Sequence, residues 1–490
     1  MHFMRFIYAL LSLFTILVYA TSVKTSNGLI LGHKASNVSQ VVEYLGIPYA
    51  QPPTGDLRSC PVAPPSPSRP YPNANAQFPK IIAAFTGSID ENRSEDCLTL
   101  NIWAKDTSAK RKPVVIYFYG GRYTIGTSHT PFYNGQYLAS ATDIIVVTVN
   151  FRINIFGFPG APNNTQNLGF LDQRLAVEWV RDNIHGFGGN PNHIVIAGQS
   201  SASVAVDYWS YSHVNDPIVK GYIEHSGDAF SFGLNSNDVA TAHWYEVSEA
   251  LGCGGSGDTL PCMRAVKNVT AIEAAAAQVK PPLVPGSDPA RPPPTFQPTP
   301  DGVSVFDDYK ARSDSGNFSR LPYLIGQTSN EAGYYKIPAY SANVTLPQSA
   351  WDHFNLADFT CPASFTAQSK VNHHVPVYRF VYFGDWDNLR LYPDSGAYHG
   401  SDVEMVFGGS LDVSGLPKST EEVKMEMVMM KAWAAFVEQP DGGLERTGWP
   451  RYEGMGTETL VRLGDSGKGE LRLGKPEEWD VGCENVTISG

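Results

Sequence analysis

The chain has 490 residues, 42% of them apolar and 12% aromatic, and its formal net charge is −12. This length allows several average domains or one large α/β unit, and the apolar content is ample for a buried core. The acidic balance excludes a nucleic acid as the partner, because binding to its phosphates depends on clustered lysines and arginines.

The first 20 residues have the pattern of a secretory signal peptide. Residues 1–5 are short and basic, residues 6–20 are almost wholly apolar, and small residues precede the expected cleavage point after Ala20. The apolar run is too short to span a bilayer comfortably, and no later segment resembles a transmembrane helix. We therefore expect a secreted, extracellular protein without a transmembrane segment, whose mature chain is residues 21–490.

Cysteines and glycosylation sequons fit this secretory route. Six cysteines in a secreted chain indicate three disulfides, and spacing suggests the local pairs Cys60–Cys97 and Cys253–Cys262, which leave Cys361 and Cys483 to pair. Spacing alone does not prove this connectivity, because six cysteines permit many others. Candidate N-glycosylation sites stand at Asn37, Asn92, Asn163, Asn268, Asn317, Asn343 and Asn485.

Short apolar segments along the chain predict strands that helices cover on both faces. They are rich in β-branched and aromatic residues and lie at 99–104, 113–119, 143–151, 193–198, 221–226, 321–326 and 377–383. Between the third and fourth of them, residues 172–184 predict an amphipathic helix, with Leu175, Trp179 and Val180 on one face. Strand, helix and strand make a crossover, so we expect one open, mainly parallel sheet whose ligands lie beyond the carboxyl ends of the strands.

Three other segments are interpreted as structural and not as catalytic or binding sites. Residues 421–440 predict a long amphipathic helix whose methionines fill the core, in preference to a thioether copper site, because no His or Cys joins them. The proline-dense stretch 281–302 indicates a surface loop within one domain. The glycines at 252–257 match a dinucleotide-binding pattern, but they follow a helix-like segment and lie between two cysteines, so a disulfide-closed turn is favoured.

A candidate nucleophile, Ser200, follows the strand at 193–198 and precedes a predicted helix. A nucleophilic serine in this position sits on a sharp turn, so the residues two places before and after it must be small. Gly198 and Ala202 meet that requirement, although the usual pattern has a second glycine. This motif alone favours a serine-rich helix start over a nucleophile.

A glycine turn strengthens the catalytic interpretation. The sequence YFYGGRYTIG, residues 117–126, follows the strand at 113–119 and exposes backbone N–H groups. Such a turn forms the oxyanion hole of esterases, where fixed donors stabilise the charge that develops in acyl transfer. The order of strand, glycine turn, strand, helix, strand and serine favours this role over a plain turn.

At this point a family resemblance is visible. The segments SEDCLTLNIW, VNFRINIFGF, NLGFLDQRLAVEWVRDNIHGFGGNP and IVIAGQSS resemble the type-B carboxylesterase and lipase family of α/β-hydrolases, which includes cholinesterases and fungal lipases. The resemblance covers most of the mature chain and is strongest from Val41 to Gly227, and secreted fungal members look closest. It implies an α/β-hydrolase fold, a large mainly parallel central sheet flanked by helices, in a single catalytic domain over residues 21–490.

The resemblance also supplies the partners of the serine. It implies that Glu331, in LIGQTSNEAGYY, is the acid and that His399, in GAYHGSDVEMVFG, is the base. An imidazole can take the serine proton and return it to a leaving alcohol, and a carboxylate orients the imidazole and stabilises its cation. The oxyanion donors carried over from the family are the N–H groups of Gly121, Arg122 and Ser201.

The chain departs from the family pattern near the serine. Arg122 replaces the usual third glycine of the oxyanion turn, and its guanidinium either narrows the acyl pocket or points away from it. Gln199 stands where many relatives have glutamate, which argues against a cholinesterase because a carboxylate that could bind a cationic substrate is lost.

We therefore expect a secreted serine hydrolase that cleaves carboxylic esters through a Ser-His-Glu triad and an acyl-enzyme, without a metal or cofactor. The alternative is a catalytically inactive adhesion or binding protein on the same scaffold. The substrate of the enzyme would be a small-molecule or lipid ester. Lipase, short-chain esterase, sterol or carotenoid esterase and feruloyl-type activity all stay open, because the fold does not fix the shape of the pocket. Residues 78–85, FPKIIAAF, form either an apolar face for acyl chains or part of the core. The oligomeric state is not predicted.

Overall fold

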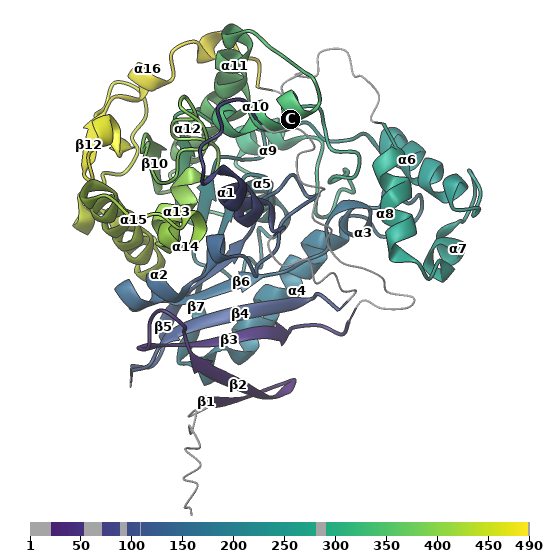
Figure 1. Ribbon diagram of the computed structural model, residues 1–490, viewed down its shortest axis with the longest axis horizontal. Coiled ribbons are helices and arrows are strands. Elements are labelled where there is room, and N and C mark those ends of the chain that lie inside the picture. Colours follow the sequence, from purple (N-terminus) through teal and green to yellow (C-terminus); the bar gives the residue numbers. More distant parts are fainter. Residues whose placement is uncertain (1–20, 53–70, 89–95, 108, 281–290, 489–490) are drawn as a thin grey trace, which may run out of the picture.

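A twelve-stranded sheet runs through the computed structural model, which describes residues 21–52, 71–88, 96–107, 109–280 and 291–488 (Figure 1). The expected signal peptide, Cys60 and Asn92 lie outside these described residues. In spatial order the strands are β1 (Thr21–Thr25), β2 (Gly28–Lys34), β3 (Val41–Pro48), β4 (Thr99–Lys105), β6 (Ile145–Val149), β5 (Lys112–Phe118), β7 (Gly189–Gln199), β8 (Tyr222–His225), β9 (Tyr323–Thr328), β10 (Val377–Tyr382), β11 (Leu460–Leu463) and β12 (Leu471–Gly474).

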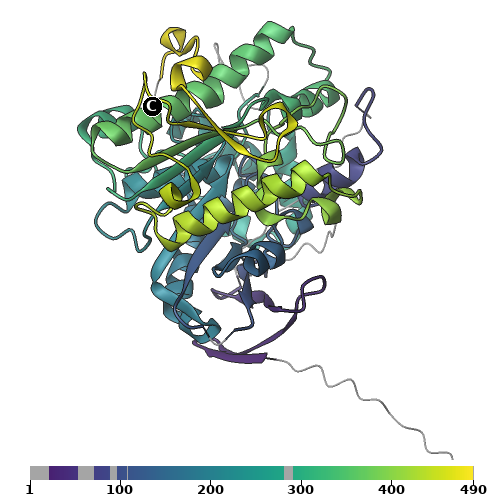
Figure 2. The same ribbon diagram turned by 90° about the vertical axis from the view of Figure 1, so that its left-hand side faces the viewer.

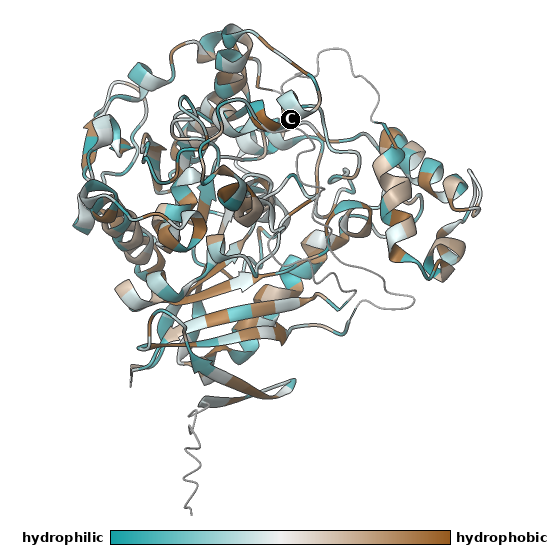
Figure 3. Ribbon diagram, viewed as in Figure 1, coloured by the Kyte–Doolittle hydropathy of each residue, from teal (hydrophilic) through white to brown (hydrophobic). Residues whose placement is uncertain are grey.

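The centre of the sheet is parallel. Strands β6, β5, β7, β8, β9, β10 and β11 run in one direction, and antiparallel pairs lie at both edges. All seven apolar segments of the sequence form strands, β4 to β10, which confirms the expected mainly parallel sheet. Their side chains are buried along almost their whole length, as in Ile116 and Ile196, which pair at 0% exposure, and these strands form the apolar centre in Figure 3.

Helices connect the strands and cover the sheet. Both α4 and α5 pack against β7, and the long helix α15 lies across β5 and β7 (Figure 2). In chain order the helices are α1 (Phe78–Thr86), α2 (Gln136–Ala141), α3 (Asn154–Gly157), α4 (Leu168–Asn183), α5 (Ser201–Ser212), α6 (Asn237–Ala250), α7 (Leu260–Ala265), α8 (Val269–Gln278), α9 (Tyr309–Ser315), α10 (Ala332–Ser341), α11 (Gln348–Asn355), α12 (Cys361–Asn372), α13 (Ser401–Phe407), α14 (Ser410–Ser414), α15 (Thr420–Glu438) and α16 (Pro476–Trp479).

For two helices, the sequence predicted which side chains are buried, and the structure tests these predictions. The crossover helix α4 forms as predicted and buries Trp179 and Val180, but Leu175 is 41% exposed. The predicted face was therefore wrong at Leu175, because the buried face includes Gln173 and Ala176 instead. Helix α15 begins with a capping box and places its methionines in the core, which confirms their packing role.

Helices α6, α7 and α8 form a lobe beside the sheet, on the right of Figure 1. The lobe has a small apolar core of its own that includes Trp244 and Val247. The disulfide Cys253–Cys262 closes the loop between α6 and α7, which confirms that the glycines at 252–257 belong to a cross-linked turn.

The second described disulfide joins two distant parts of the chain. Cys361, at the start of α12, is bonded to Cys483 near the end of the described chain, so the expected pairs Cys253–Cys262 and Cys361–Cys483 are confirmed. The partner expected for Cys97, Cys60, lies outside the described residues. In the part of the chain that the structure describes, no helix has the length and apolar character needed to cross a membrane.

We expect the two described disulfides to differ in their contribution to stability. Replacing Cys361 and Cys483 together by alanine should lower the free energy of unfolding by about 4–5 kcal/mol, because the bond spans 122 residues of sequence. Replacing Cys253 and Cys262, which are 9 residues apart, should cost about 2–3 kcal/mol. Denaturant unfolding of both variants measures the difference, and a larger loss for the short loop would contradict the loop-entropy argument.

Candidate active site

The predicted site residues come from loops at the carboxyl ends of neighbouring parallel strands. Gly121 follows β5, Ser200 follows β7, Glu331 follows β9, and His399 lies on the long connection after β10. In parallel sheets these loops gather at one edge, where ligands bind. The topology therefore brings together residues that are far apart in sequence.

Ser200 occupies the turn between β7 and α5 in a strained conformation. Its φ of 58° and ψ of −128° are unusual for a residue with a side chain, and Ser200 is only 3% exposed. The turn is held because the Ser200 N–H donates to the His225 carbonyl at 2.7 Å and the Ser200 carbonyl accepts from Val204 at 3.0 Å. This arrangement is the sharp strand-to-helix turn expected of a nucleophile.

Close backbone packing explains the glycine before Ser200. A Cβ atom on Gly198 would lie 2.3 Å from the carbonyl oxygen of Ala202. A methyl group there would therefore push the first turn of α5 away from β7. On the other side, a Cβ atom on Gly227 would lie 2.6 Å from the Ser200 carbonyl oxygen, so that turn also requires glycine.

We expect Gly198→Ala to lower the free energy of unfolding by about 1–3 kcal/mol, because the methyl group meets backbone that cannot move alone. Activity should fall with it, since the displaced turn carries Ser200. The matched control is Gly233→Ala, where a Cβ atom meets no atom within 4 Å. Thermal unfolding and ester hydrolysis of both variants check this, and equal stability would show that the turn tolerates a methyl group.

Glu331 and His399 are in direct contact. The His399 Nδ1–H donates to Glu331 Oε2 at 2.5 Å, and their exposures are 2% and 1%. The other carboxylate oxygen, Oε1, accepts from the Ser226 hydroxyl at 2.7 Å and from the Thr328 N–H at 2.8 Å. Three donors therefore hold the carboxylate, and its orientation holds the imidazole.

Backbone pairing brings the two loops of this contact together. Asn330 and Tyr398, the residues before Glu331 and His399, form an isolated parallel β-bridge. The Asn330 N–H donates to the Ala397 carbonyl at 3.0 Å. The Glu331–His399 contact is thus supported by main-chain hydrogen bonds between two loops.

The free side of the imidazole faces Gln199 and Tyr335. Nδ1 carries the proton that is hydrogen-bonded to Glu331, so Nε2 is an acceptor. The Gln199 side-chain amide donates to Nε2 at 3.0 Å. The Tyr335 hydroxyl lies 3.4 Å from the same atom and also contacts the Ser200 hydroxyl. The structure therefore brings Ser200, His399 and Glu331 into one cluster, but at Nε2 it places Gln199 in the position that a serine proton donor would take.

The expected oxyanion donors lie beside Ser200. Among the described residues, nothing accepts a hydrogen bond from the N–H groups of Gly121 and Arg122, and the N–H of Ser201 is free because it opens α5. The Tyr123 N–H donates to the Ser201 hydroxyl at 3.3 Å, which ties the glycine turn to the serine turn. A Cβ atom on Gly120 would lie 2.9 Å from Ser200 Cβ, so this glycine permits the close approach.

A cavity of about 810 Å³ adjoins this cluster through Arg122 and Tyr335. Helix α1 forms one wall, and the side chains of Phe78 and Ile82 line it while Ile81 is fully buried at 0% exposure. The segment 78–85 therefore serves both expected roles, cavity wall and core. The remaining lining comes from Tyr71, Ala74, Asn75, Ala76, Pro79, Ala83, Thr86, Ser88, Thr124 and Ile125, from Tyr334, Ile337, Pro338 and Ser341 of α10, and from Ala342 after it.

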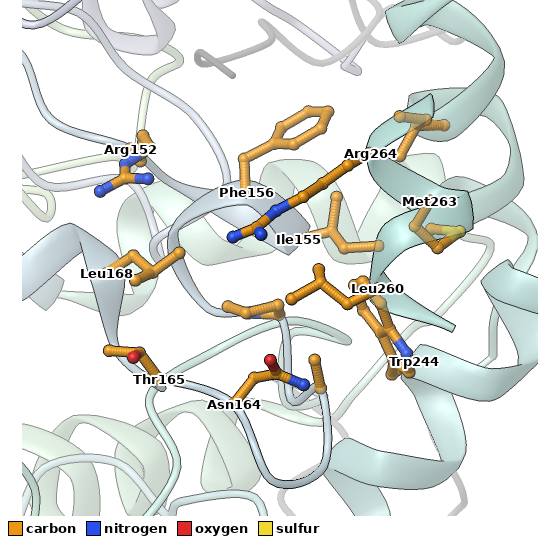
Figure 4. Close-up of a pocket in the computed structure, with 13 residues that line it drawn as sticks. Arg152, Ile155, Phe156, Asn164, Thr165, Leu168, Trp244, Leu260, Met263 and Arg264 are labelled. Atoms are coloured by element: carbon orange, nitrogen blue, oxygen red, sulfur yellow. The ribbon is translucent and has the colours of Figure 1, made fainter. Parts of the chain in front are cut away.

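Another cavity, of about 300 Å³, lies between α3 and the helical lobe (Figure 4). Ile155, Leu260 and Met263 face one another across it, and Arg152 at its edge is paired with Asp172 at 2.7 Å. None of the residues that line this cavity belongs to the cluster around Ser200. We therefore assign the candidate active site to the larger cavity.

Several residues of the site had no clear signal in the sequence. Ser226, which holds Glu331, stands in the turn after β8, and its φ of 56° is a feature that sequence does not show. Tyr335 lies one helical turn after Glu331, so it faces the same side of α10. Burial raises the pKa of Tyr335, so its hydroxyl keeps its proton beside Ser200 and His399.

Comparisons with known proteins show that the chain is similar to ester hydrolases. The chain matches the sequence profile described as the Carboxylesterase family over residues 19–355 and 342–478. It is 31% identical to Secreted lipase 5 of Gibberella zeae over 92% of this chain and 91% of that protein. It is 30% identical to chlorogenic acid esterase of Aspergillus niger over 91% of each. A solved structure of PNB esterase has a TM-score of 0.75 at 23% identity, covering 93% of this chain and 97% of the other, which confirms the expected α/β-hydrolase fold.

Proposed function

Because the chain belongs to the Carboxylesterase family and is a carboxylic ester hydrolase, we propose that Ser200, His399 and Glu331 are its catalytic triad. The observation that carries this proposal is the contact of His399 Nδ1 with Glu331 Oε2 at 2.5 Å, beside a serine held on a strained turn. This contact leaves Nε2 without a proton, which is the form that a general base requires. An inactive binding protein would lack part of this machinery, whereas all three residues are present.

In the proposed acylation step, His399 Nε2 takes the proton of Ser200 while the serine oxygen attacks the ester carbonyl. Gln199 must release Nε2 for this transfer, and its amide holds the ring in place until the ester displaces it. Glu331 stabilises the imidazolium that forms, without taking its proton. The imidazolium then donates its proton to the leaving alcohol, and an acyl-enzyme on Ser200 remains.

The negative oxygen of the tetrahedral intermediate lies beside the N–H groups of Gly121, Arg122 and Ser201 in this proposal. Fixed donors of this kind stabilise the charge as it develops, with little reorganisation. A water molecule activated by His399 then attacks the acyl group, releases the acid and restores Ser200. These steps use protein groups alone, and we propose that the reaction needs no metal or cofactor.

We further propose that the protein is secreted after removal of residues 1–20, and that residues 21–490 form one catalytic domain. One sheet that runs from β1 to β12 supports the single domain, and the two described disulfides support an oxidising compartment. The six described sequon asparagines are exposed, as a glycan requires: Asn37, Asn163, Asn268, Asn317, Asn343 and Asn485.

The cavity beside Ser200 favours esters larger than acetates. Its volume of about 810 Å³ is within the range of pockets that hold drug-sized ligands, and α1 and α10 give it apolar walls. The proposed substrates are therefore esters with a medium acyl chain or an aryl group. Hydrolysis of para-nitrophenyl acetate, butyrate, octanoate and palmitate tests this, with Ser200→Ala as the control. We expect kcat/KM to peak between the extremes, and a steady fall from acetate onward would contradict the size argument.

A further inference from the structure

Among the described residues, no carboxylate forms an ion pair with either of two arginines beside the candidate active site. Arg291 is only 9% exposed, and within the described part of the chain it forms neither an ion pair nor a hydrogen bond. Its guanidinium lies 3.4 Å above the centroid of the Phe232 ring and 5.9 Å from that of Tyr335. Because the Tyr335 hydroxyl reaches His399 Nε2 at 3.4 Å, this cation is one aromatic ring away from the proposed base.

Arg122 is the second of these cations. Its Nη2 donates to the carbonyl of Pro292, next to Arg291 in the chain, and its buried Nε–H has no acceptor among the described residues. Burial and the like charge of Arg291 lower the pKa of Arg122 to about 10. Arg122 is also one of the residues that line the large cavity, so the residue at the family's third glycine position borders the substrate space.

Other buried cations of this chain are paired with carboxylates. Arg379 lies 2.6 Å from Asp480, Lys370 lies 3.4 Å from Asp207, and these four side chains are all 0% exposed. Such pairing is the general rule, because a buried charge without a partner is costly. Glu331, the carboxylate of the site, is already held by Ser226, Thr328 and His399. Among the described residues, Glu331 forms no ion pair with either arginine.

We propose that Arg122 and Arg291 bind a carboxylate carried by the ester substrate, so that the enzyme prefers anionic esters to neutral ones. The inference rests on the proposed function, since it names the substrate class of the same site. Guanidinium groups bind carboxylates through paired N–H donors, and in the described part of the chain each arginine retains a buried Nε–H without an acceptor. In this arrangement the arginines hold the carboxylate, and the apolar part of the substrate lies in the cavity that Arg122 borders.

Matched pairs of esters that differ only in charge test the proposal. One pair, para-acetoxybenzoate and para-acetoxybenzamide, varies the alcohol part. The other, mono-para-nitrophenyl glutarate and its terminal amide, varies the acyl part. We expect the acid to exceed its amide in kcat/KM by about tenfold or more in one pair, the size of a charged hydrogen-bonded contact, and the pair that responds identifies which part carries the carboxylate.

Substitutions of Arg291 and Arg122 test whether these residues cause the preference for acid-bearing esters. Arg291→Met should lower the ratio of kcat/KM for the acid to kcat/KM for the amide to about one. Arg291→Lys should keep part of this preference, because lysine keeps the positive charge but lacks the paired N–H donors of the guanidinium. Arg122→Met is a second measurement should Arg291→Met fail to fold, since effects on the oxyanion turn cancel in the ratio. The matched control is Arg312→Met, because Arg312 also lies over a ring, 3.5 Å from Phe306, but pairs with Asp308; it should leave the ratio unchanged.

The outcomes separate this inference from the proposed function. If wild type hydrolyses the amide-bearing esters as fast as the acid-bearing esters in both pairs, the anion site is overturned and the triad is left intact. A wild-type preference that survives in Arg291→Met and Arg122→Met also overturns it. If wild type and Ser200→Ala hydrolyse all four esters equally, the proposed triad fails, and the anion site fails with it.

Discussion

Replacing Ser200 by alanine lowers kcat for ester hydrolysis by about 10⁴-fold or more, because the covalent route through an acyl-enzyme is lost. The fold should be unaffected, since alanine removes only a hydroxyl group from a residue that the backbone holds in place through His225 and Val204. Steady-state hydrolysis of a para-nitrophenyl ester measures the loss, and trapping of the acyl-enzyme by mass spectrometry identifies the modified residue. A label on any other serine would contradict the assignment.

A neighbouring serine supplies the control for this variant. Ser203 lies in the first turn of α5, the helix that follows Ser200. It is 0% exposed, and its hydroxyl donates to the Gly227 carbonyl at 2.5 Å. Ser203→Ala therefore removes a buried hydroxyl within one turn of Ser200 without touching the reacting groups. We expect some loss of stability and nearly full activity. A similar collapse of activity in both variants would indicate damage to the helix and not loss of a nucleophile.

Replacing Glu331 by glutamine should lower kcat by about 10³–10⁴-fold, although the side chain keeps its shape. The carboxylate accepts from Ser226, Thr328 and His399. An amide has one acceptor atom where two are needed, so its NH₂ group meets either the Ser226 side or the imidazole. An NH₂ group facing Nδ1 moves the imidazole proton to Nε2, and the imidazole is then no longer a base toward Ser200.

The double variant Ser200→Ala, Glu331→Gln tests whether the two residues act together. If they belong to one triad, the double variant is no slower than Ser200→Ala alone, because the imidazole has no serine left to activate. Measured rates for wild type, both single variants and the double variant give this comparison. Multiplicative losses would show that Glu331 acts on some other step or on stability, and thermal unfolding of each variant separates those two cases.

Much of the fold was predictable because it depends on short-range patterns. The strands β4 to β10 are continuous apolar segments, and burial on both faces leaves that pattern in the sequence. The strands β1, β2 and β12 are partly exposed and lack such a pattern, so they were not predicted, and β3 and β11 were also missed. The exposure of Leu175 has a similar origin, because helix periodicity does not show which flank the neighbouring elements cover.

The candidate site divides in the same way. The turn at Ser200 was visible because its requirements lie within five consecutive residues, Gly198 to Ala202. Glu331 and His399 came from a family resemblance, because their contact joins residues 68 apart and depends on two loops that pair through Asn330 and Tyr398. The contact of Gln199 with His399 joins residues 200 apart, and no local pattern indicates it.

The sequence by itself determined the strands β4 to β10, the serine turn and the glycine turn, since each depends on neighbours in the chain. Only the tertiary structure decided that Gln199 and Tyr335 face the imidazole and that Leu175 is exposed. It also decided that Arg122 and Arg291 lie close together, where no carboxylate of the described residues pairs with them. The physical reason is that conformational preference is a property of adjacent residues, whereas the meeting of charged and polar side chains depends on how the loops of the whole sheet pack.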